Sequence, residues 1–304
     1  MRIVLVANAA SGSFRDGLTP DAIRARLAAA GFDLAPEPDP GLPLPERLER
    51  AARSEGVAAV AVAGGDGTLN CAAGILAGTG VALAVLPLGT MNLLAKDLGL
   101  PLDLDGAIAA LRTGRPRAVD LGEVNGHVFL INSVIGMPAR VARHRERFRG
   151  RRLSPLGLAR LMLATLRHLG PYPRLRATVS VGGGRERLAL RLLCVVNNDY
   201  AEGFGKILER ERVDGGGLAL YIARRLPPWR LARLALGFAA GNWRGVSGLE
   251  RHEGTGLAIS AGRRALRVMN DGEIRLIASP LRYRLRPRAL TVIVPVQAPR
   301  EDRP

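Results

Sequence analysis

The chain has 304 residues, 47% of them hydrophobic and only 4% aromatic, which is enough to bury a core and to support two modest domains. The formal net charge is +17 and comes almost entirely from arginine, so the surface favours anionic partners such as lipid headgroups, nucleic acid or phosphorylated metabolites. Two cysteines exclude a disulfide framework, and the apolar stretches at 156–169 and 231–240 are too short, or too often interrupted by arginine, to span a membrane.

The first part of the chain alternates short apolar runs with helical segments. It begins directly in an apolar strand at 3–7 without a signal-peptide pattern, which predicts a cytoplasmic protein. Further strands are expected at 57–63 and 81–86, because a parallel strand covered on both faces is a continuous apolar run. Helices are expected at 19–30, 45–54, 69–78, 93–98 and 104–113. This βαβ series predicts an α/β, Rossmann-like domain.

After about Asp120 the pattern changes to strands separated by turn residues. Strands are expected at 127–135, 174–181, 187–196, 217–222, 256–260, 264–269 and 273–278. Several short strands with turn signals between them indicate a mostly antiparallel, β-rich second domain. We therefore expect residues 1–120 to form the α/β domain and residues 121–287 to form the β-rich domain.

The most informative segment lies where the strand at 57–63 ends. There Gly64-Gly65-Asp66-Gly67-Thr68-Leu69-Asn70 opens the next helix. Glycines let backbone N–H groups approach an anion closely, and the helix N-terminus adds partial positive charge, so this loop is suited to hold phosphate. Phosphate would repel the Asp66 carboxylate unless a cation stands between them or a proton must be taken, which indicates magnesium or base chemistry. The alternative is an ordinary tight turn that binds nothing.

A second loop of the same build follows the strand at 81–86. Gly89-Thr90-Met91-Asn92 opens a helix there, and a helix cap by Thr90 without any ligand is the simpler interpretation. A third polar loop, Asn8-Ala9-Ala10-Ser11-Gly12, follows the first strand. Loops of this kind side by side make a nucleotide site.

These loops resemble the three nucleotide-binding loops of the diacylglycerol kinase catalytic-domain family, which includes bacterial lipid kinases and sphingosine kinases. Their order and spacing fit along nearly the whole chain, and Asp271-Gly272-Glu273 matches the family's Asp-Gly-Glu near the C-terminus. The resemblance implies that the first domain is like that of NAD kinases and phosphofructokinases. It also implies that the last apolar strand, and with it residues 288–304, returns to that domain.

The resemblance further implies an ATP-dependent lipid kinase of phospholipid metabolism, which transfers the γ-phosphoryl group of ATP to the hydroxyl of diacylglycerol or a related lipid. ATP and Mg²⁺ would be its cofactors, with the nucleotide held at Asn8, Ser11, Gly12, Gly64, Gly65, Asp66, Gly67, Thr68, Leu69, Asn70, Gly89, Thr90 and Asn92. Glu273 corresponds to the family's proton acceptor, with Asp66 and Asp271 as its partners. Asp66 corresponds to the acceptor of the sphingosine-kinase branch.

Two of the matched motifs also have simpler interpretations. Asp271-Gly272 between apolar runs is the pattern of a type I′ hairpin, although a rigid turn is also a good place from which to aim a carboxylate. The segment from Asp214 to Leu218 resembles the place where bacterial relatives hold a structural magnesium, which would make these two residues metal ligands. A glycine-rich hairpin that binds no metal is the alternative there.

Departures from the family pattern leave two other functions open. Cys71 stands where the family has Glu, Met91 stands where it has Gly, and the proline-rich loop at 36–41 has no Thr. These departures favour a non-catalytic lipid- or nucleotide-binding protein, whereas the retained carboxylates oppose it. An NAD kinase-like enzyme would share the Gly-Gly-Asp-Gly turn.

Two basic stretches bear on partners and location. Arg140–Arg152 and the helix candidate Pro228–Trp243 suit peripheral association with a membrane that offers the lipid substrate and anionic phospholipid headgroups. A solvated basic face on a core helix is the commoner explanation of such a stretch. Proteins that read nucleic acid usually stack its bases on aromatic rings, and only 4% of this chain is aromatic, so we expect no nucleic-acid partner. The sequence leaves open whether the protein forms a homodimer.

Overall fold

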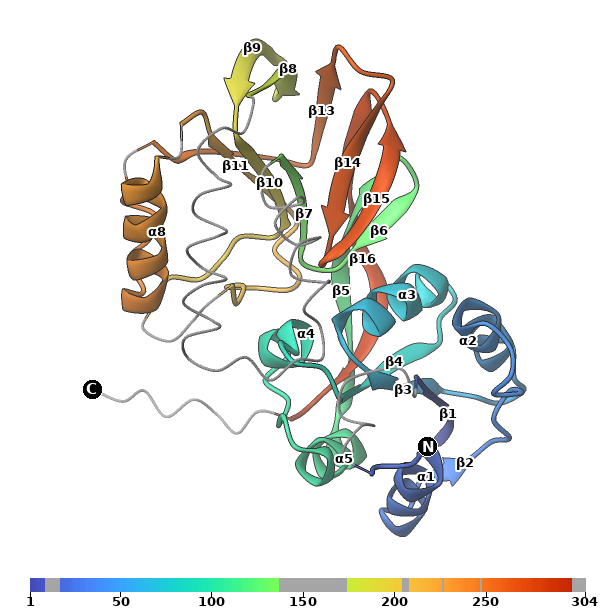
Figure 1. The fold of residues 1–304 in the computed structure, drawn as a ribbon. Coiled ribbons are helices and arrows are strands. Elements are labelled where there is room, and N and C mark those ends of the chain that lie inside the picture. Colours follow the sequence, from blue (N-terminus) through green and yellow to red (C-terminus); the bar gives the residue numbers. More distant parts are fainter. Residues whose placement is uncertain (9–16, 137–173, 204–207, 226, 247, 297–304) are drawn as a thin grey trace. The chain divides into compact units, whose positions relative to one another are not determined.

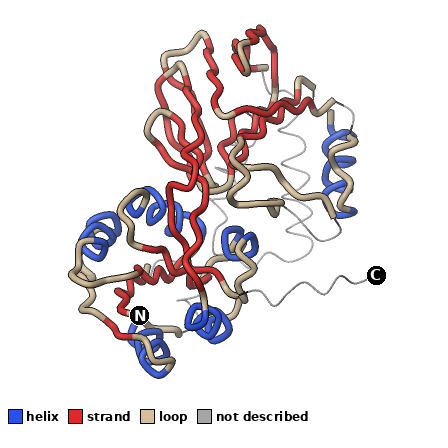
Figure 2. The backbone as a smooth tube through the Cα atoms, turned by 180° about the vertical axis from the view of Figure 1, so that it is seen from behind, coloured by secondary structure: helices blue, strands red, loops and turns tan. Residues whose placement is uncertain are grey.

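The computed structural model describes residues 1–8, 17–136, 174–203, 208–225, 227–246 and 248–296 (Figure 1). The chain divides into two compact units. Unit 1 comprises Met1–Leu121, Arg212–Asp214 and Arg286–Pro304, and unit 2 comprises Gly122–Glu211 and Gly215–Leu285. Most of the described helices belong to unit 1, whereas the described part of unit 2 is mainly strand (Figure 2).

Unit 1 is an α/β domain built on a parallel sheet. Its elements are β1 (Arg2–Ala7), α1 (Pro20–Ala29), β2 (Asp33–Leu34), α2 (Leu44–Ala52), β3 (Ala59–Gly64), α3 (Asp66–Leu76), β4 (Ala82–Pro87), α4 (Leu93–Asp97), α5 (Leu104–Thr113), the first part of β5 (Arg115–Val124) and the last part of β16 (Leu281–Val294). The strands follow the order β2-β1-β3-β4-β16, and each pairs in parallel with its neighbour.

Helices cover both faces of this sheet, as the continuous apolar runs predict. Helices α2 and α3 pack on one face, and α1 and α5 pack on the other (Figure 1). Strands β3 and β4 are therefore buried along their whole lengths. The loops that follow these strands are the ones that carry the predicted nucleotide motifs.

Unit 2 is an antiparallel β sandwich. Its elements are β6 (His127–Phe129), β7 (Asn132–Gly136), β8 (Leu175–Val181), β9 (Gly184–Leu190), β10 (Leu192–Asn197), β11 (Leu218–Ala223), α8 (Pro228–Ala240), β12 (Glu250–Gly254), β13 (Gly256–Ala261), β14 (Ala265–Asn270) and β15 (Glu273–Ala278). One layer has the order β12-β11-β10-β7-β14-β15, and the other contains β13, β8, β9 and the first part of β16. Apolar side chains from both layers, such as Leu193, Val268 and Ile259, form the core between them.

Two expected strands are interrupted in the structure. The expected strand at 127–135 is broken into β6 and β7, because the N–H groups of Leu130 and Ile131 donate to the Asp271 carboxylate instead of to a neighbouring strand. The expected strand at 187–196 is broken at Arg191 into β9 and β10, which belong to different layers of the sandwich. Within the described residues, no helix is long and apolar enough to cross a membrane.

Candidate functional site

The two glycine-rich loops of unit 1 leave the sheet side by side. Gly64 at the end of β3 pairs with Pro87 at the end of β4, and the Leu88 N–H donates to the Gly64 carbonyl at 3.0 Å. The loops then meet backbone to backbone, since a Cβ added to Gly89 would lie 2.7 Å from the Cα of Gly65. Only glycine permits this approach, so the spacing of the two loops depends on the residue type that the motifs specify.

Asp66 joins the two loops. Its two carboxylate oxygens accept hydrogen bonds from the N–H groups of Asn92 at 3.1 Å and Leu93 at 2.9 Å, at the start of α4. Asn92 has a left-handed backbone with φ of 49°, and its side-chain Oδ1 accepts the Gly89 N–H at 2.8 Å. Helix α4 is therefore capped by a residue 26 positions earlier. Thr90, the cap in the alternative interpretation of this loop, is exposed instead.

The N-terminus of α3 offers backbone N–H groups to a ligand. The helix begins at Asp66. Its N-cap is Gly65, which has no side chain that could accept the N–H groups of the first turn. The first backbone hydrogen bond of the helix is donated by Leu69 to the Gly65 carbonyl at 3.0 Å. The N–H groups of Asp66, Gly67 and Thr68 thus have no partner within the helix, and the helix dipole makes this end favourable for an anion.

Several predicted contact residues support these loops from within. The Thr68 side chain is buried, and its hydroxyl accepts a hydrogen bond from Asn8 Nδ2 at 2.8 Å, which ties the loop after β1 to the loop after β3. Thr68 lies inside α3, whose N-cap is Gly65. Leu69 and Asn70 are buried on α3. Ser11 and Gly12 lie outside the described residues.

The Gly65–Gly89 contact can be tested by one substitution. We expect Gly89→Ala to push the loops apart, to lower the unfolding free energy by about 1–3 kcal/mol, as overpacking does, and to weaken nucleotide binding. Gly245→Ala is the matched control, because a Cβ there meets nothing within 4 Å. Calorimetric titration with nucleotide and thermal unfolding measure the two effects. Equal behaviour of the two variants would contradict the packing argument.

The predicted acidic motif of unit 2 lies on the hairpin between β14 and β15. Asn270 pairs with Glu273, and the two turn residues, Asp271 and Gly272, have φ of 47° and 90°. Positive φ at both central positions is the geometry of a type I′ turn. The hairpin interpretation is therefore confirmed.

The turn directs Asp271 into the protein. Its carboxylate accepts three backbone N–H groups, from Leu130 at 2.6 Å and from Ile131 and Asn132 at 2.9 Å each. Burial nevertheless raises the pKa of Asp271 to about 6, because desolvation of the charged form outweighs the three hydrogen bonds that favour it. Asp271 is thus positioned to fix the hairpin against the 130–132 segment.

Glu273 has a different environment, although it stands only two residues away. Its side chain is 45% exposed and forms an ion pair with Arg275 at 3.1 Å. Within unit 2 the structure thus separates the two carboxylates, one held in a backbone cradle and the other reaching solvent. Of the two, Glu273 is the one that is accessible to a ligand from solvent.

The residues that hold the Asp271 cradle were not predicted from the sequence. The Leu130 carbonyl accepts from Asn197 Nδ2 at 2.8 Å and from Arg210 Nη1 at 2.7 Å, and both donors are buried. The adjacent Asn132 side chain donates to the Tyr200 hydroxyl at 2.7 Å. The only sequence signal is the polar run that follows the apolar strand at 192–197.

Titration of Asp271 gives a second prediction. Because its pKa is raised above the unfolded value of 3.8, its contribution to stability is fully present below about pH 4 and is lost as the pH rises through about 6. The difference in unfolding free energy between wild type and Asp271→Asn should therefore fall from pH 4 to pH 7, as denaturant unfolding would measure. A difference that stays constant, or that grows with pH, would contradict the burial argument.

The predicted metal ligand Asp214 is held by arginines. Its carboxylate accepts from Arg117 at 2.8 Å and from Arg212 at 3.4 Å, and the hydrogen bond from Arg117 is the main cause that lowers the pKa of Asp214. Leu218, the other predicted ligand, is a buried residue of β11. No group of three or more His, Cys, Asp or Glu side chains forms a metal site among the described residues. A magnesium site at Asp214 and Leu218 stays a prediction.

Comparison with known proteins matches two parts of the chain to two family models. Residues 2–124 match the model of the diacylglycerol kinase catalytic domain, and residues 132–294 match that of the YegS C-terminal NAD kinase beta sandwich-like domain. A "probable lipid kinase YegS-like" of Pseudomonas aeruginosa is 34% identical over 266 residues, which cover 84% of this chain and 85% of the relative. A Pseudomonas putida protein of the same description is 29% identical over 275 residues, which cover 84% and 83%.

A solved structure shares the fold. The crystal structure of a diacylglycerol kinase from Bacillus anthracis str. Sterne superposes with a TM-score of 0.69, at 21% sequence identity, and covers 96% of each chain. At this identity the similarity shows the fold alone.

Proposed function

The chain belongs to the YegS-like lipid kinase family with a diacylglycerol kinase catalytic domain, and we propose that it transfers the γ-phosphoryl group of ATP to the hydroxyl of diacylglycerol or a related lipid. The observation that carries the proposal is the pair of loops joined by Asp66, which places the N-terminus of α3 beside that of α4. Phosphoryl transfer requires mainly positioning and charge stabilisation from a protein, and backbone N–H groups at fixed positions supply both.

The described residues of unit 1 fit the phosphate groups of a nucleotide. The N–H groups of Asp66, Gly67 and Thr68 have no helical partner, and Gly65 and Gly89 leave the loop backbones free of side chains where they meet. Mg²⁺ bound with ATP would neutralise charge on the β- and γ-phosphates, and it needs few protein ligands because it keeps several waters. Each Asp66 oxygen accepts one N–H, which leaves further lone pairs for a ligand.

We assign proton acceptance to Glu273 and positioning to Asp66 and Asp271. Both oxygens of Asp66 hold the start of α4, and Asp271 holds the 130–132 segment, whereas the Glu273 carboxylate is exposed. In the proposed reaction the lipid hydroxyl loses its proton to Glu273 while its oxygen bonds to the γ-phosphorus. The bond from that phosphorus to the bridging oxygen of ATP breaks, and ADP leaves.

The experiment that tests this function is the transfer of labelled γ-phosphate from ATP to defined acceptors in mixed micelles with Mg²⁺. The acceptors are diacylglycerol, a sphingoid base, phosphatidylglycerol, a polyprenol and NAD. Label in diacylglycerol or another lipid supports the proposal and identifies the substrate. Label in NAD would support the NAD kinase-like alternative, and nucleotide binding without any transfer would support a non-catalytic binding protein.

A further inference from the structure

The β8–β9 hairpin presents a row of arginines away from the core of unit 2. In its register Thr178 pairs with Arg187, Arg176 with Ala189, and Ser180 with Arg185. Alternate residues of a strand share one face, and the opposite face of this hairpin, which includes Val179 and Leu188, packs in the core. The arginines of the outer face are therefore directed to solvent.

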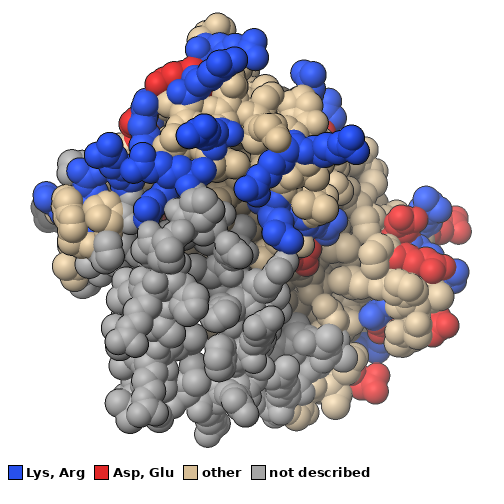
Figure 3. Space-filling view, turned by 45° about the horizontal axis from the view of Figure 1, so that its top comes forward, with Lys and Arg blue, Asp and Glu red and all other residues tan. Residues whose placement is uncertain are grey.

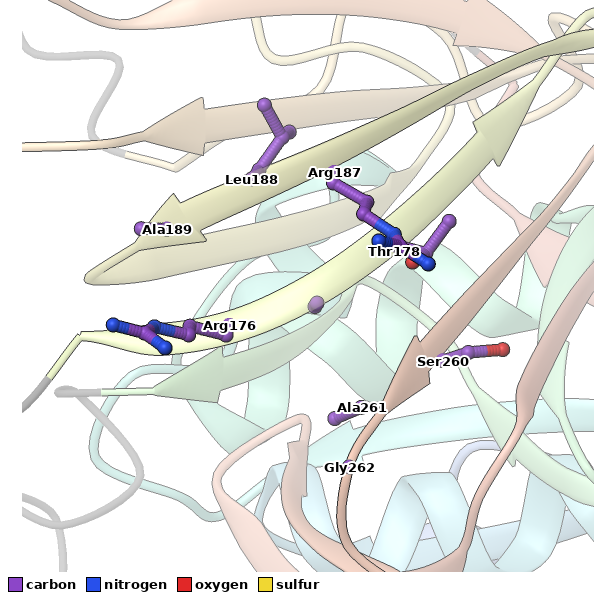
Figure 4. Close-up of a pocket in the computed structure, with 9 residues that line it drawn as sticks. Arg176, Thr178, Arg187, Leu188, Ala189, Ser260, Ala261 and Gly262 are labelled. Carbon is purple, nitrogen blue, oxygen red and sulfur yellow. The ribbon is translucent and has the colours of Figure 1, made fainter.

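A shallow hollow lies on this outer face. It has a volume of ≈ 440 Å³, and its polar lining comes from Arg176, Thr178, Arg187 and Ser260. In Figure 4 the Arg187 side chain lies beside Thr178, its partner in the register, and the small residue Ala261 of β13 also lines the hollow. Two guanidinium groups and two hydroxyls, with no acidic residue in the lining, make this hollow suitable for anions.

A second hollow continues from the end of the hairpin to the start of α8. It has a volume of ≈ 360 Å³ and is lined by Arg174, Arg191, Arg225, Arg230, Pro227 and Trp229. Arg174 and Arg191 adjoin the last pair of the hairpin register, Leu175 with Leu190, so the two hollows follow one another along the hairpin. We call the arginines of this surface the basic strip: Arg174, Arg176, Arg185, Arg187, Arg191, Arg225 and Arg230.

The basic strip differs from its surroundings in its charge balance. The neighbouring Arg224 forms ion pairs with Glu186 at 2.9 Å and with Glu250 at 2.6 Å, whereas neither hollow has an acidic residue in its lining. Figure 3 shows basic side chains spread over the upper part of the molecule, where β8 and β9 lie, with few acidic ones among them. The strip therefore carries a local excess of positive charge that an anionic partner would neutralise.

Helix α8 adds exposed apolar side chains next to the strip. Trp229 is 58% exposed and Leu236 is 69% exposed, and their spacing of seven residues places them on the same face of the helix. Arg233, also exposed, lies between them. The Arg230 guanidinium lies 5.0 Å from the Trp229 ring centroid, so charge and aromatic surface meet at this point.

We propose that the basic strip, together with Trp229 and Leu236, is the surface that docks the protein on a bilayer containing anionic phospholipid. Phospholipid headgroups carry negative charge that complements the arginines of the strip, and the interfacial region of a bilayer accommodates a tryptophan ring and a leucine side chain. Nucleic acid would match the charge but would leave Leu236 without an apolar partner. This inference deepens the proposed function, because it gives a lipid kinase its route to a membrane-bound substrate.

Vesicle binding tests the proposal. We expect the protein to sediment with vesicles of phosphatidylcholine mixed with phosphatidylglycerol, to bind phosphatidylcholine alone much more weakly, and to be released by salt. Arg176→Gln with Arg187→Gln should weaken binding to the anionic vesicles about 30-fold, which corresponds to about 1 kcal/mol for each arginine. The matched control is Arg53→Gln with Arg112→Gln, two exposed arginines of unit 1, which should bind as wild type does. Equal binding by the two double variants would overturn the proposal.

The apolar contribution is tested separately. Trp229→Ala with Leu236→Ala should weaken binding about tenfold and, unlike the arginine changes, should do so even at high salt. Wild-type affinity in this variant would overturn the apolar part of the surface. An RNA oligomer serves as the competing ligand, and strip-dependent binding to it without vesicle binding would overturn the bilayer as the partner.

A kinase assay separates this inference from the proposed function. The Arg176→Gln, Arg187→Gln variant should phosphorylate short-chain diacylglycerol in neutral detergent micelles as wild type does, and should lose activity only on anionic vesicles. A wild-type protein that binds vesicles through the strip but phosphorylates no lipid would refute the function and leave the docking surface standing. If the wild-type enzyme and the Arg176→Gln, Arg187→Gln variant were equally active on anionic vesicles, the docking surface alone would be refuted.

Discussion

Replacement of Asp66 by Asn should reduce kcat/KM for ATP by about 100-fold or more. The carboxylate accepts two backbone N–H groups of the second loop, one on each oxygen. Asn can accept only one of them, because its NH₂ group would face the other N–H. Hydrogen bonds to a charged group contribute about 1.5–3 kcal/mol each, so their loss would release the start of α4 from α3. We expect KM for ATP to rise as well as kcat to fall, because the nucleotide loops themselves would move.

The control for this substitution is Asp21→Asn. Asp21 occupies the first turn of α1 as Asp66 occupies the first turn of α3, but it is exposed, whereas Asp66 accepts the N–H groups that begin α4. Steady-state kinetics with varied ATP should leave this control unchanged. A fall in kcat for Asp66→Asn at an unchanged KM for ATP would instead make Asp66 the proton acceptor, as in the sphingosine-kinase branch.

Replacement of Glu273 by Gln should lower kcat by about 10²- to 10⁴-fold and leave KM for ATP unchanged. General bases contribute to catalysis on this scale, and Gln keeps the size of the side chain while it loses the ability to take a proton. Glu273 belongs to the β14–β15 hairpin of unit 2, whereas the predicted ATP loops belong to unit 1, so the substitution leaves the residues of those loops unchanged and KM for ATP with them.

Glu253 provides a closely matched control. It is an exposed strand residue of unit 2 that is paired with an arginine two positions away, Arg251, as Glu273 is paired with Arg275. Glu253→Gln should retain full activity. If Glu273→Gln also retained it, the assignment of proton acceptance to Glu273 would be wrong.

The sequence was sufficient to predict features that depend on local patterns. Continuous apolar runs identified β3 and β4, because parallel strands covered by helices on both faces require them. Turn chemistry identified the hairpin at Asp271 and Gly272, since few residue pairs adopt positive φ at both positions. The α/β and β-rich parts follow from the change in hydrophobic period near residue 120.

The features that were missed depend on contacts between distant residues. Local sequence offered Thr90 as an alternative cap of its own helix, but the cap is Asp66, because the close packing of Gly65 and Gly89 brings that carboxylate to the start of α4. The break between β6 and β7 arises from Asp271, which is about 140 residues away in the chain. Neither hydrophobic periodicity nor local propensity reports contacts between distant residues. The contact of Arg210 with the Leu130 carbonyl, which supports the Asp271 cradle, could therefore not be predicted either.

The most direct test of the lipid-kinase assignment is to incubate the protein with a total bacterial lipid extract and ATP labelled at the γ-phosphate, and to measure label in the organic phase. Our account predicts magnesium-dependent label in a lipid phosphomonoester, abolished in Glu273→Gln and retained in Glu253→Gln. Label that stays in ATP, or that appears only as inorganic phosphate or in NADP, would contradict it.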